Sequence, residues 1–529
     1  MKRVGKACAR IAAIGALALS LAGAAAAQTP RQVDLVIGGG VVIDGTGDPR
    51  RNADIAVDDG RIVLVGDASR LRARRAIDAS NLVVAPGFID PHTHSLSDLT
   101  SDDTERRRAL NHLTQGVTTI LVGNDGDGTF EIAAQRSQLE RSRVGVNVGA
   151  FVGFGSVREA VLGQAARAPS PQELDRMRAL VAQGMCEGAV GFSAGLYYAP
   201  QSFSQTEEVI ALAREASLRG GLYETHLRDE SSDNIGLLAA AEEALRIGRE
   251  AGLPVHFAHI KAQGVDVHGR SGRVIELIEA AQAAGQRVTA DQYPWRASGT
   301  RVSNALIPRW TQEDGGQAAM RRRLADPALS ERLNREIADN IRRRGGPESL
   351  LLTSGEFRGR HLGQVAEAMG VDPVEAARRI ALAGDARLAS FNMREDDIRN
   401  FMARPWVVTS SDATQGHPRR FGTFPMKFAL YVRDQPLLTV EQFVHRSSGL
   451  TAQIFGLEGR GLLREGYAAD IVVFDPRRYA ARASYEEPEL YSEGVLYAIV
   501  NGELAIDRAT ATGVLAGQAL AHTPTGGCE

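Results

Sequence analysis

The sequence has no excess of positive charge, few cysteines and only one long apolar run. Its 61 Lys and Arg residues nearly balance 64 Asp and Glu, so the formal net charge is -3. This balance gives no electrostatic basis for binding nucleic acid or an anionic membrane surface. No repeat or low-complexity segment stands out after the N-terminal region. With 43% hydrophobic residues, the composition is that of an ordinary globular protein.

The long apolar run lies at the N-terminus. Four basic residues within the first ten precede an uncharged Ala- and Leu-rich stretch, Ile11 to Ala27, which ends in three alanines. This pattern is typical of a secretory signal peptide. The run is short for a membrane span, which would be the alternative. We therefore expect residues 1–27 to be removed after Ala27, and the mature protein to be periplasmic or secreted and free of membrane.

The three cysteines do not define a disulfide framework. Cys8 would leave with the predicted signal peptide, Cys186 lies at a predicted helix end, and Cys528 lies in the tail. An exported protein could join the last two, but their spacing does not require it. We favour two unpaired thiols.

A length of 529 residues exceeds one ordinary domain and suits a large barrel with a smaller partner. Residues 28–84 and 455–515 both contain short strand-like runs broken by Gly- and Asp-rich turns. Two β-rich ends around a long middle predict one β-sandwich built from both ends of the chain.

The middle, residues 85–454, alternates strand-like and helix-like runs, which predicts a (β/α)8 barrel. A longer charged and helical stretch before the last strand indicates a subdomain inserted between strands 7 and 8, at residues 300–355. The eight candidate strands are Val84–Asp90, Val117–Gly123, Val146–Phe154, Ala189–Ser193, Gly221–His226, Pro254–Ile260, Arg287–Gln292 and Trp406–Ser411.

Candidate metal ligands stand at the ends of these strands. The first strand ends in His92-Thr93-His94. Residues two apart on a strand point to one side, so both imidazoles can reach one ion. His226 ends the fifth strand, and the sixth contains His256 and His259, which have opposite parity. We expect His226 and His259 to be ligands suited to zinc.

The remaining histidines are interpreted as ordinary surface or core residues: His112, His268, His361, His445 and His522.

A carboxylate, Asp412, follows the eighth strand. At this end of the barrel it could act as a general base and then as a general acid. A helix cap or turn is the alternative role for an aspartate in this position. Four histidines at other strand ends favour the catalytic role.

The chain resembles the amidohydrolase superfamily and, within it, the N-acyl-D-amino-acid deacylase (D-aminoacylase) family. The resemblance runs from Val33 to about Gly502. Its motifs are residues 84–94 (VAPGFIDPHTH), 188–198 (GAVGFSAGLYY) and 288–294 (VTADQYP), with Ser411-Asp412 and the nearby HPR and GTFP stretches at 417–419 and 422–425.

The resemblance implies a sandwich-plus-barrel fold and a site for one or two zinc or other divalent ions. His92 and His94 would hold the more weakly bound ion, His226 and His259 the tighter one, and Asp412 would be the catalytic acid and base.

The resemblance also implies that Arg419, Lys261 and Tyr198 hold the carboxylate of an N-acyl amino acid, for which these donors are suited. As alternatives, Arg419 could be a surface charge, Tyr198 a core residue, and Lys261 the partner of a nearby acid.

One position departs from the family pattern. The family usually has a Cys ligand in a Gly-Asn-Cys-Gly stretch, where this chain reads Gly123-Asn124-Asp125-Gly126. A carboxylate can bridge two metals, so we expect Asp125 to be a ligand, with Asp127 as a nearby alternative. Because oxygen is a harder donor than sulfur, a divalent metal other than zinc is also compatible with the site.

These observations predict an enzyme that cleaves the amide bond of N-acyl-D-amino acids or of a dipeptide with a D-residue. A dipeptidase, a cyclic-amide hydrolase or a lactonase on the same scaffold is one alternative. A non-catalytic exported binding protein is another, although four histidines with Asp412 argue against it. The preference for D over L substrates follows from the resemblance alone.

Overall fold

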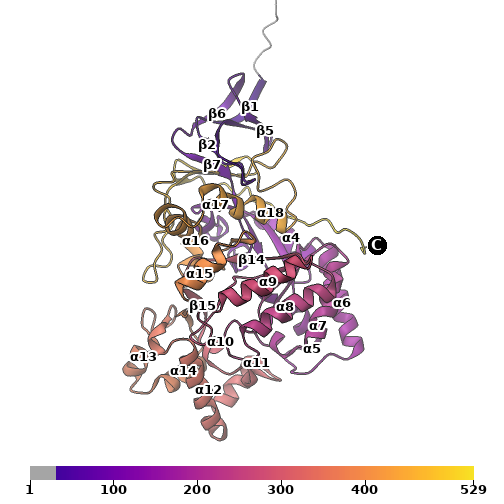
Figure 1. Cartoon of the computed structure of the whole chain (residues 1–529), viewed down its shortest axis with the longest axis vertical. Helices are drawn as coiled ribbons and strands as arrows, with labels where there is room; N and C mark the ends of the chain where they lie inside the picture. The colour runs from indigo at the N-terminus through magenta and orange to yellow at the C-terminus, as the bar shows by residue number, and fades with distance from the viewer. Residues whose placement is uncertain (1–30, 529) are drawn as a thin grey trace, which may run out of the picture.

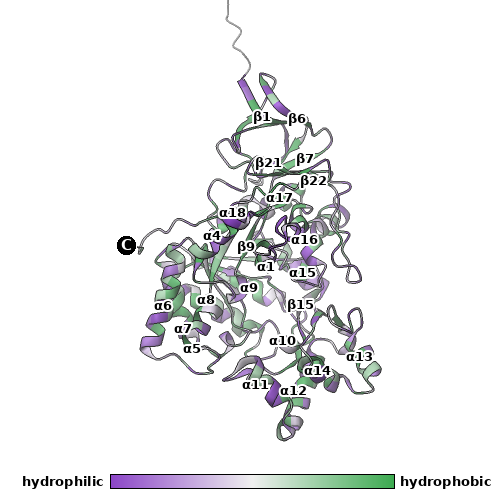
Figure 2. Ribbon diagram, turned by 180° about the vertical axis from the view of Figure 1, so that it is seen from behind, coloured by the Kyte–Doolittle hydropathy of each residue, from purple (hydrophilic) through white to green (hydrophobic). Residues whose placement is uncertain are grey.

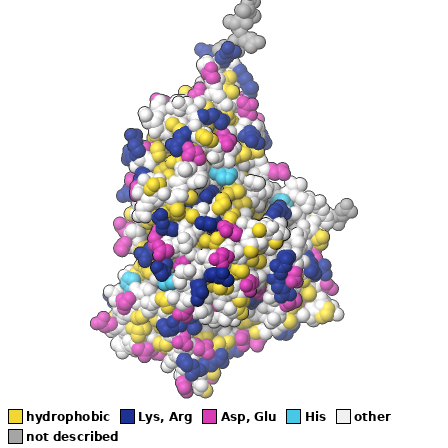
Figure 3. Space-filling model, in the orientation of Figure 1, with side chains coloured by type: hydrophobic (Ala, Val, Ile, Leu, Met, Phe, Trp, Pro, Cys, Tyr) yellow, Lys and Arg dark blue, Asp and Glu magenta, His cyan; other side chains and the backbone are white. Residues whose placement is uncertain are grey.

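The computed structural model describes residues 31–528. Figure 1 shows three parts stacked along the long axis: a β-sandwich at one end, a barrel in the middle and a helical insertion at the other end. None of the helices in this range has both the length and the apolar character that spanning a bilayer requires. Acidic and basic side chains are interspersed over the face drawn in Figure 3.

The barrel is a single sheet of eight parallel strands in the order β18-β14-β13-β12-β11-β10-β9-β8. At its mouth, the His94 amide donates a hydrogen bond to the carbonyl of Ala413, which links the first and last strand ends. The predicted (β/α)8 fold is confirmed. The strands are β8 (Phe88–Asp90), β9 (Val117–Val122), β10 (Asn147–Gly153), β11 (Gly191–Gly195), β12 (Leu222–His226), β13 (Val255–Phe257), β14 (Val288–Gln292) and β18 (Val407–Thr409).

Helices cover the outside of the barrel and bury one apolar face each. Figure 2 shows hydrophobic residues along strands such as β9 and hydrophilic residues on outer helices such as α6. The start of α6 follows from its sequence, because Ser170 and Glu173 form a capping box and Pro171 opens the helix. The covering helices include α4 (Ile132–Ser142), α6 (Pro171–Cys186), α7 (Thr206–Ser217), α8 (Leu237–Ala251), α9 (Ser271–Ala283) and α15 (Glu395–Met402).

The predicted first strand is in fact two strands that belong to different sheets. β7 (Val83–Pro86) pairs with β19 (Ile471–Phe474) in the sandwich, whereas β8 begins the barrel. Gly87 separates them, and a Cβ there would lie 2.1 Å from the Thr118 hydroxyl oxygen. Only glycine allows this close approach, and the chain passes from the sandwich to the barrel at this residue.

Both ends of the chain build the sandwich, as predicted. One sheet has the order β5-β4-β1-β6, and the other β22-β21-β20-β19-β7-β2-β3, so β7 and β19 join segments far apart in the chain. The apolar side chains of the two sheets form one core. The strands are β1 (Arg31–Gly38), β2 (Val41–Val42), β3 (Arg51–Asn52), β4 (Asp54–Asp58), β5 (Arg61–Gly66), β6 (Leu71–Asp78), β20 (Val495–Val500), β21 (Glu503–Asp507) and β22 (Thr510–Ala511).

The insertion between β14 and β18 has its own sheet and its own apolar core. It runs from β15 (Ala297–Arg301) to β17 (Arg387–Phe391), beyond the predicted range of 300–355, because the central strand of its sheet comes last in sequence. The other elements are β16 (Leu350–Leu352), α10 (Val302–Leu306), α11 (Gly316–Leu324), α12 (Ser330–Arg343), α13 (Leu362–Met369) and α14 (Pro373–Leu382).

The C-terminal tail lies against the barrel end opposite the mouth. The Leu520 amide donates to the Val148 carbonyl, and the His522 amide to that of Gly188. The tail ends in a disulfide between Cys528 and Cys186, the last residue of α6. The prediction of two unpaired thiols is therefore wrong. The two cysteines are 342 positions apart in the sequence, and their proximity depends on the path of the tail.

We expect Cys528→Ser to loosen the tail without disrupting the barrel. A cross-link that closes a long loop stabilises a fold by about 2–4 kcal/mol, and here the effect should concentrate in residues 514–525. Hydrogen exchange followed by mass spectrometry should show faster exchange in this segment. Cys186→Ser should give the same change. Full alkylation of both cysteines in unreduced protein would contradict the disulfide.

Candidate active site

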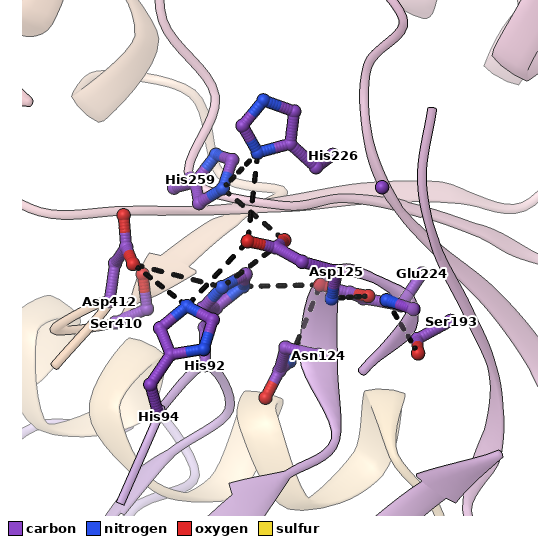
Figure 4. A network of polar contacts seen from close by, with 12 residues as sticks. His92, His94, Asn124, Asp125, Ser193, Glu224, His226, His259, Ser410 and Asp412 are labelled. Carbon is purple, nitrogen blue, oxygen red and sulfur yellow. Dashed lines mark hydrogen bonds and ion pairs between the residues drawn. The ribbon is translucent and has the colours of Figure 1, made fainter. Parts of the chain in front are cut away.

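The predicted ligands meet at the carboxyl ends of the barrel strands. His92 and His94 follow β8, His226 is the last residue of β12, and His259 follows β13. Asp412 follows β18 and faces the same group (Figure 4). Because parallel strands end at one mouth of a barrel, residues more than 300 positions apart become neighbours.

Asp125 occupies the centre of this group (Figure 4). Its Oδ1 lies 3.5 Å from His92 Nε2 and 3.5 Å from His259 Nε2. Its Oδ2 lies 3.6 Å from His94 Nε2 and 3.7 Å from His226 Nδ1. Each carboxylate oxygen therefore faces two imidazoles.

The donor geometry fits two divalent ions that share Asp125. His92, His94 and Asp125 offer ligand atoms within 4.8 Å of one another, and so do Asp125, His226 and His259. Nε2 of His92 and Oδ1 of Asp125 are buried and have no hydrogen-bond partner among the described residues. Buried polar atoms without a partner are costly. Nitrogen and carboxylate donors in this arrangement suit zinc and related metals.

The backbone at this mouth adopts conformations that are rare for side-chain-bearing residues. The φ angles are 58° at Asp125, 33° at His259 and 48° at Asp412. Positive φ values of this kind carry a cost of order 1–3 kcal/mol each, and they cluster at functional sites. Three such residues in one group indicate that the fold places these side chains at the expense of local stability.

Two glutamates that we did not predict from the sequence hold the imidazoles. Glu224 Oε1 lies 3.1 Å from His92 Nδ1, which leaves Nε2 of this ring turned toward Asp125. Glu230 Oε1 lies 3.3 Å from His259 Nδ1. Carboxylates behind ligating histidines fix the ring orientation. Glu224 could have been found, because it stands two residues before His226 on the same strand and shares its parity.

Asp412 is buried between histidines and an arginine. Its Oδ1 lies 3.4 Å from His94 Nε2, and its Oδ2 lies 2.8 Å from Nη1 of Arg419. Burial alone would raise the pKa of Asp412, but the Arg419 charge and the histidines hold it below its ordinary value. These charges therefore favour the ionised form of Asp412.

The three predicted substrate-binding residues have different positions around a cavity of about 460 Å³. Tyr198 and Lys261 line it, and so does Asp127. The Lys261 ammonium donates a 2.7 Å hydrogen bond to Glu230, so part of its charge is already compensated. Arg419 is only 1% exposed and stands behind Asp412, outside the residues that line the cavity.

The other histidines have structural partners or lie elsewhere. Nε2 of His256 is 3.0 Å from Asp291, and Nε2 of His112 is 2.9 Å from the Ser95 hydroxyl. Asp291 also accepts a hydrogen bond from the His259 amide, so it supports the strand end that carries His259. We did not predict this role of Asp291.

The protein has an eight-stranded parallel barrel with histidines and aspartates at its strand ends, and a sandwich built from both chain ends. This combination defines the class of metal-dependent barrel hydrolases. The chain belongs to the amidohydrolase family, whose model matches residues 75–308 and 314–506. The family resemblance in the sequence motifs is thereby confirmed.

Three similar proteins illustrate the relationship. A D-aminoacylase of Alcaligenes xylosoxydans xylosoxydans is 34% identical and covers 93% of this chain and 98% of its own length. An N-acyl-D-aspartate deacylase of that organism is also 34% identical, over 93% and 96%. The crystal structure of N-acyl-D-glutamate deacylase from Bordetella bronchiseptica, complexed with zinc and a phosphonate inhibitor, has a TM-score of 0.79 at 33% identity, over 93% of this chain and all of that one.

We expect Asp125→Ala to lower the bound metal content, because the substitution removes the carboxylate common to both ligand groups. Metal per chain should be measured by mass spectrometry after gel filtration in buffer of defined free zinc. Asp127→Ala is the matched control, since Asp127 lines the cavity outside both groups. An unchanged metal content in Asp125→Ala would show that this residue is not a ligand.

Proposed function

We propose that this protein hydrolyses the amide bond of N-acyl-D-amino acids to a carboxylate and a free D-amino acid, using one or two zinc or similar divalent ions. The observation that carries the proposal is Asp125, shared by two histidine pairs beside Asp412 in a cavity. The similarity to three D-amino-acid deacylases supports both the reaction and the handedness of the substrate.

The ligand set would be His92, His94 and Asp125 for one ion, and Asp125, His226 and His259 for the other. A divalent ion bound there supplies Lewis acidity, which activates water and polarises the scissile carbonyl. The protein contributes the fixed positions of these donors, with Glu224 and Glu230 behind two of the rings.

Asp412 would transfer the proton that the reaction has to move. As an ionised carboxylate at the cavity wall, it accepts the proton that the attacking water loses. It then delivers this proton to the leaving nitrogen, so that the free amine can depart. Arg419, 2.8 Å from Oδ2, fixes the orientation of the carboxylate and leaves Oδ1 toward the histidines.

Lys261 and Tyr198 line the cavity, which supports the proposal that they contact the carboxylate of the substrate. Contact of the same carboxylate with Arg419 stays a prediction, because this guanidinium pairs with Asp412. A polar wall with cationic groups favours substrates that carry a free carboxylate over cyclic amides and lactones, which lack one.

We also propose that the protein is exported to the periplasm or secreted. The basic start and the apolar run at residues 11–27 support this, although they lie outside the described residues. The Cys186–Cys528 disulfide is a second support, since disulfides persist in oxidising compartments. N-terminal sequencing of the exported protein should begin at Gln28. A chain that remains inside the cell would contradict the proposal.

Asp412→Asn should retain metal and fold but lose nearly all turnover, by about 10³-fold or more, because an amide cannot accept the proton. The measurement is steady-state hydrolysis of an N-acetyl-D-amino acid by the zinc-loaded enzyme. Metal content and thermal midpoint near those of the parent protein serve as controls. Turnover within a factor of ten of the parent would remove Asp412 from the acid and base role.

A panel of matched N-acetyl-D- and N-acetyl-L-amino acids tests the reaction itself. We expect release of the free D-amino acid with zinc present, at a rate at least 100-fold above that for the L-enantiomer. Ninhydrin-type detection of the free amine with chiral chromatography measures both products. Hydrolysis of the L series alone, or of none of the panel, would overturn the proposed function.

A further inference from the structure

The inserted subdomain contributes an arginine-rich wall to the active-site cavity. Arg301 from β15, Arg344 just after α12 and Arg387 from β17 all line the cavity. The four carboxylates that line it, Asp125, Asp127, Glu230 and Asp412, come from the barrel. The acids, the candidate metal ligands and Lys261 therefore lie on the barrel side of the cavity, and the three arginines lie on the insertion side (compare the positions of β15 and α12 in Figure 1).

Two of these arginines oppose each other directly. Arg301 and Arg387 are antiparallel partners in the register of β15 and β17, so their side chains leave the same face of the sheet. Like charges in such a pair destabilise a sheet. The Arg301 guanidinium reaches Asp385 only at 4.0 Å. The Arg387 guanidinium makes no hydrogen bond or ion pair with any residue in 31–528.

The electrostatic surroundings of Arg387 agree with this geometry. Burial and the positive charges of Arg301 and Arg419 lower the pKa of Arg387. A half-buried guanidinium among other cations is costly unless an anion joins them. An anion in the cavity would be within reach of this guanidinium, because Arg387 lines the cavity.

Arg344 adds a third cation that is deeper in the wall. It is 5% exposed, and it donates to the Tyr197 hydroxyl (3.1 Å) and to the Ala305 carbonyl (3.2 Å). No carboxylate of the described residues lies within ion-pair distance of it. Its partners are neutral, so its charge also remains available to a ligand.

Apolar side chains are scarce around the cavity. Of the lining residues, Tyr197, Tyr198 and Ala199 have largely apolar side chains, Gly299 has none, and the others are polar or charged. A D-leucine or D-phenylalanine side chain would find no apolar pocket to enter. An anionic group would find three arginines.

We propose that the substrate carries a second carboxylate, in addition to the α-carboxylate, and that Arg387 binds it together with Arg301 and Arg344. This inference rests on the proposed function and narrows its substrate class to N-acyl-D-amino acids with a second acidic group. Guanidinium groups bind carboxylates through two parallel hydrogen bonds, which makes them suited to this task. The second carboxylate can belong to the side chain of the amino acid or to the acyl group.

Matched substrates separate these possibilities. N-acetyl-D-glutamate and N-acetyl-D-glutamine differ by one charge at nearly constant shape, and N-succinyl-D-leucine and N-acetyl-D-leucine differ by a carboxylate on the acyl group. We expect kcat/KM for the dianionic member of at least one pair to exceed that of its neutral partner by about 100-fold. A preference within the first pair assigns the carboxylate to the side chain, and a preference within the second assigns it to the acyl group.

Variants at Arg387 connect the preference to this wall. Arg387→Gln should lower kcat/KM for the preferred dianionic substrate by about 30-fold, mainly through KM, and change the neutral partner less than threefold. Arg387→Lys should recover part of the loss, because it restores a charge without the bidentate geometry. Arg335→Gln is the matched control, since Arg335 is an exposed arginine of the same insertion, in α12, outside the cavity.

The outcomes distinguish this inference from the proposed function. If neutral N-acyl-D-amino acids are hydrolysed as well as their dianionic partners, the second-carboxylate site is wrong and the deacylase proposal stands. Equal losses for both substrates in Arg387→Gln would reduce Arg387 to a structural role and overturn the assignment. If no N-acyl-D-amino acid is hydrolysed, the proposed function itself fails.

Discussion

The burial of one carboxylate among four imidazoles is the constraint on which the rest of this structure depends. Asp125 is 4% exposed and has four ring nitrogens at 3.5–3.7 Å. Bringing these groups together requires four segments that are far apart in the chain, and the closed mouth of a parallel barrel offers such converging strand ends. The strained backbone at Asp125, His259 and Asp412 is the local cost of that convergence. The barrel strands beneath are buried almost throughout, with Thr289 of β14 only partly so, and their apolar packing offsets this cost.

The charge of the barrel mouth gives the insertion its electrostatic role. A barrel rim carrying Asp125, Asp127, Glu230 and Asp412 is strongly acidic unless metal ions and cations balance it. The insertion brings arginines to the opposite wall, so acidic and basic side chains lie on different walls of the cavity. In the proposed reaction, the arginines would attract the carboxylates of the substrate and leave its amide group toward the histidines.

Local patterns in the sequence predicted the barrel and most of the residues at its mouth. The features that depend on long-range contacts could not be predicted in this way. Strand parity and strand ends were sufficient to predict that His92, His94, His226, His259 and Asp412 would meet, because the regular geometry of a barrel converts position along a strand into position in space. The split of the first strand at Gly87 and the late partner strand β17 were not visible, since both depend on which distant segment packs against them. The Cys186–Cys528 disulfide was missed for the same reason. Glu224 had a readable signal in its spacing from His226, whereas the opposition of Arg301 and Arg387 depends on a register that no local pattern specifies.

The aspartate at position 125 has a geometric consequence that a cysteine, the usual residue of the family pattern, would not have. A thiolate presents one donor atom, so both ligand groups would have to share it. A carboxylate presents two oxygens, and here Oδ1 faces His92 and His259 while Oδ2 faces His94 and His226. Each oxygen thus faces one histidine from each ligand pair. Asp125 therefore stands between the two histidine pairs as one planar group that faces both. The left-handed backbone at Gly123, Asp125 and Gly126 places this carboxylate.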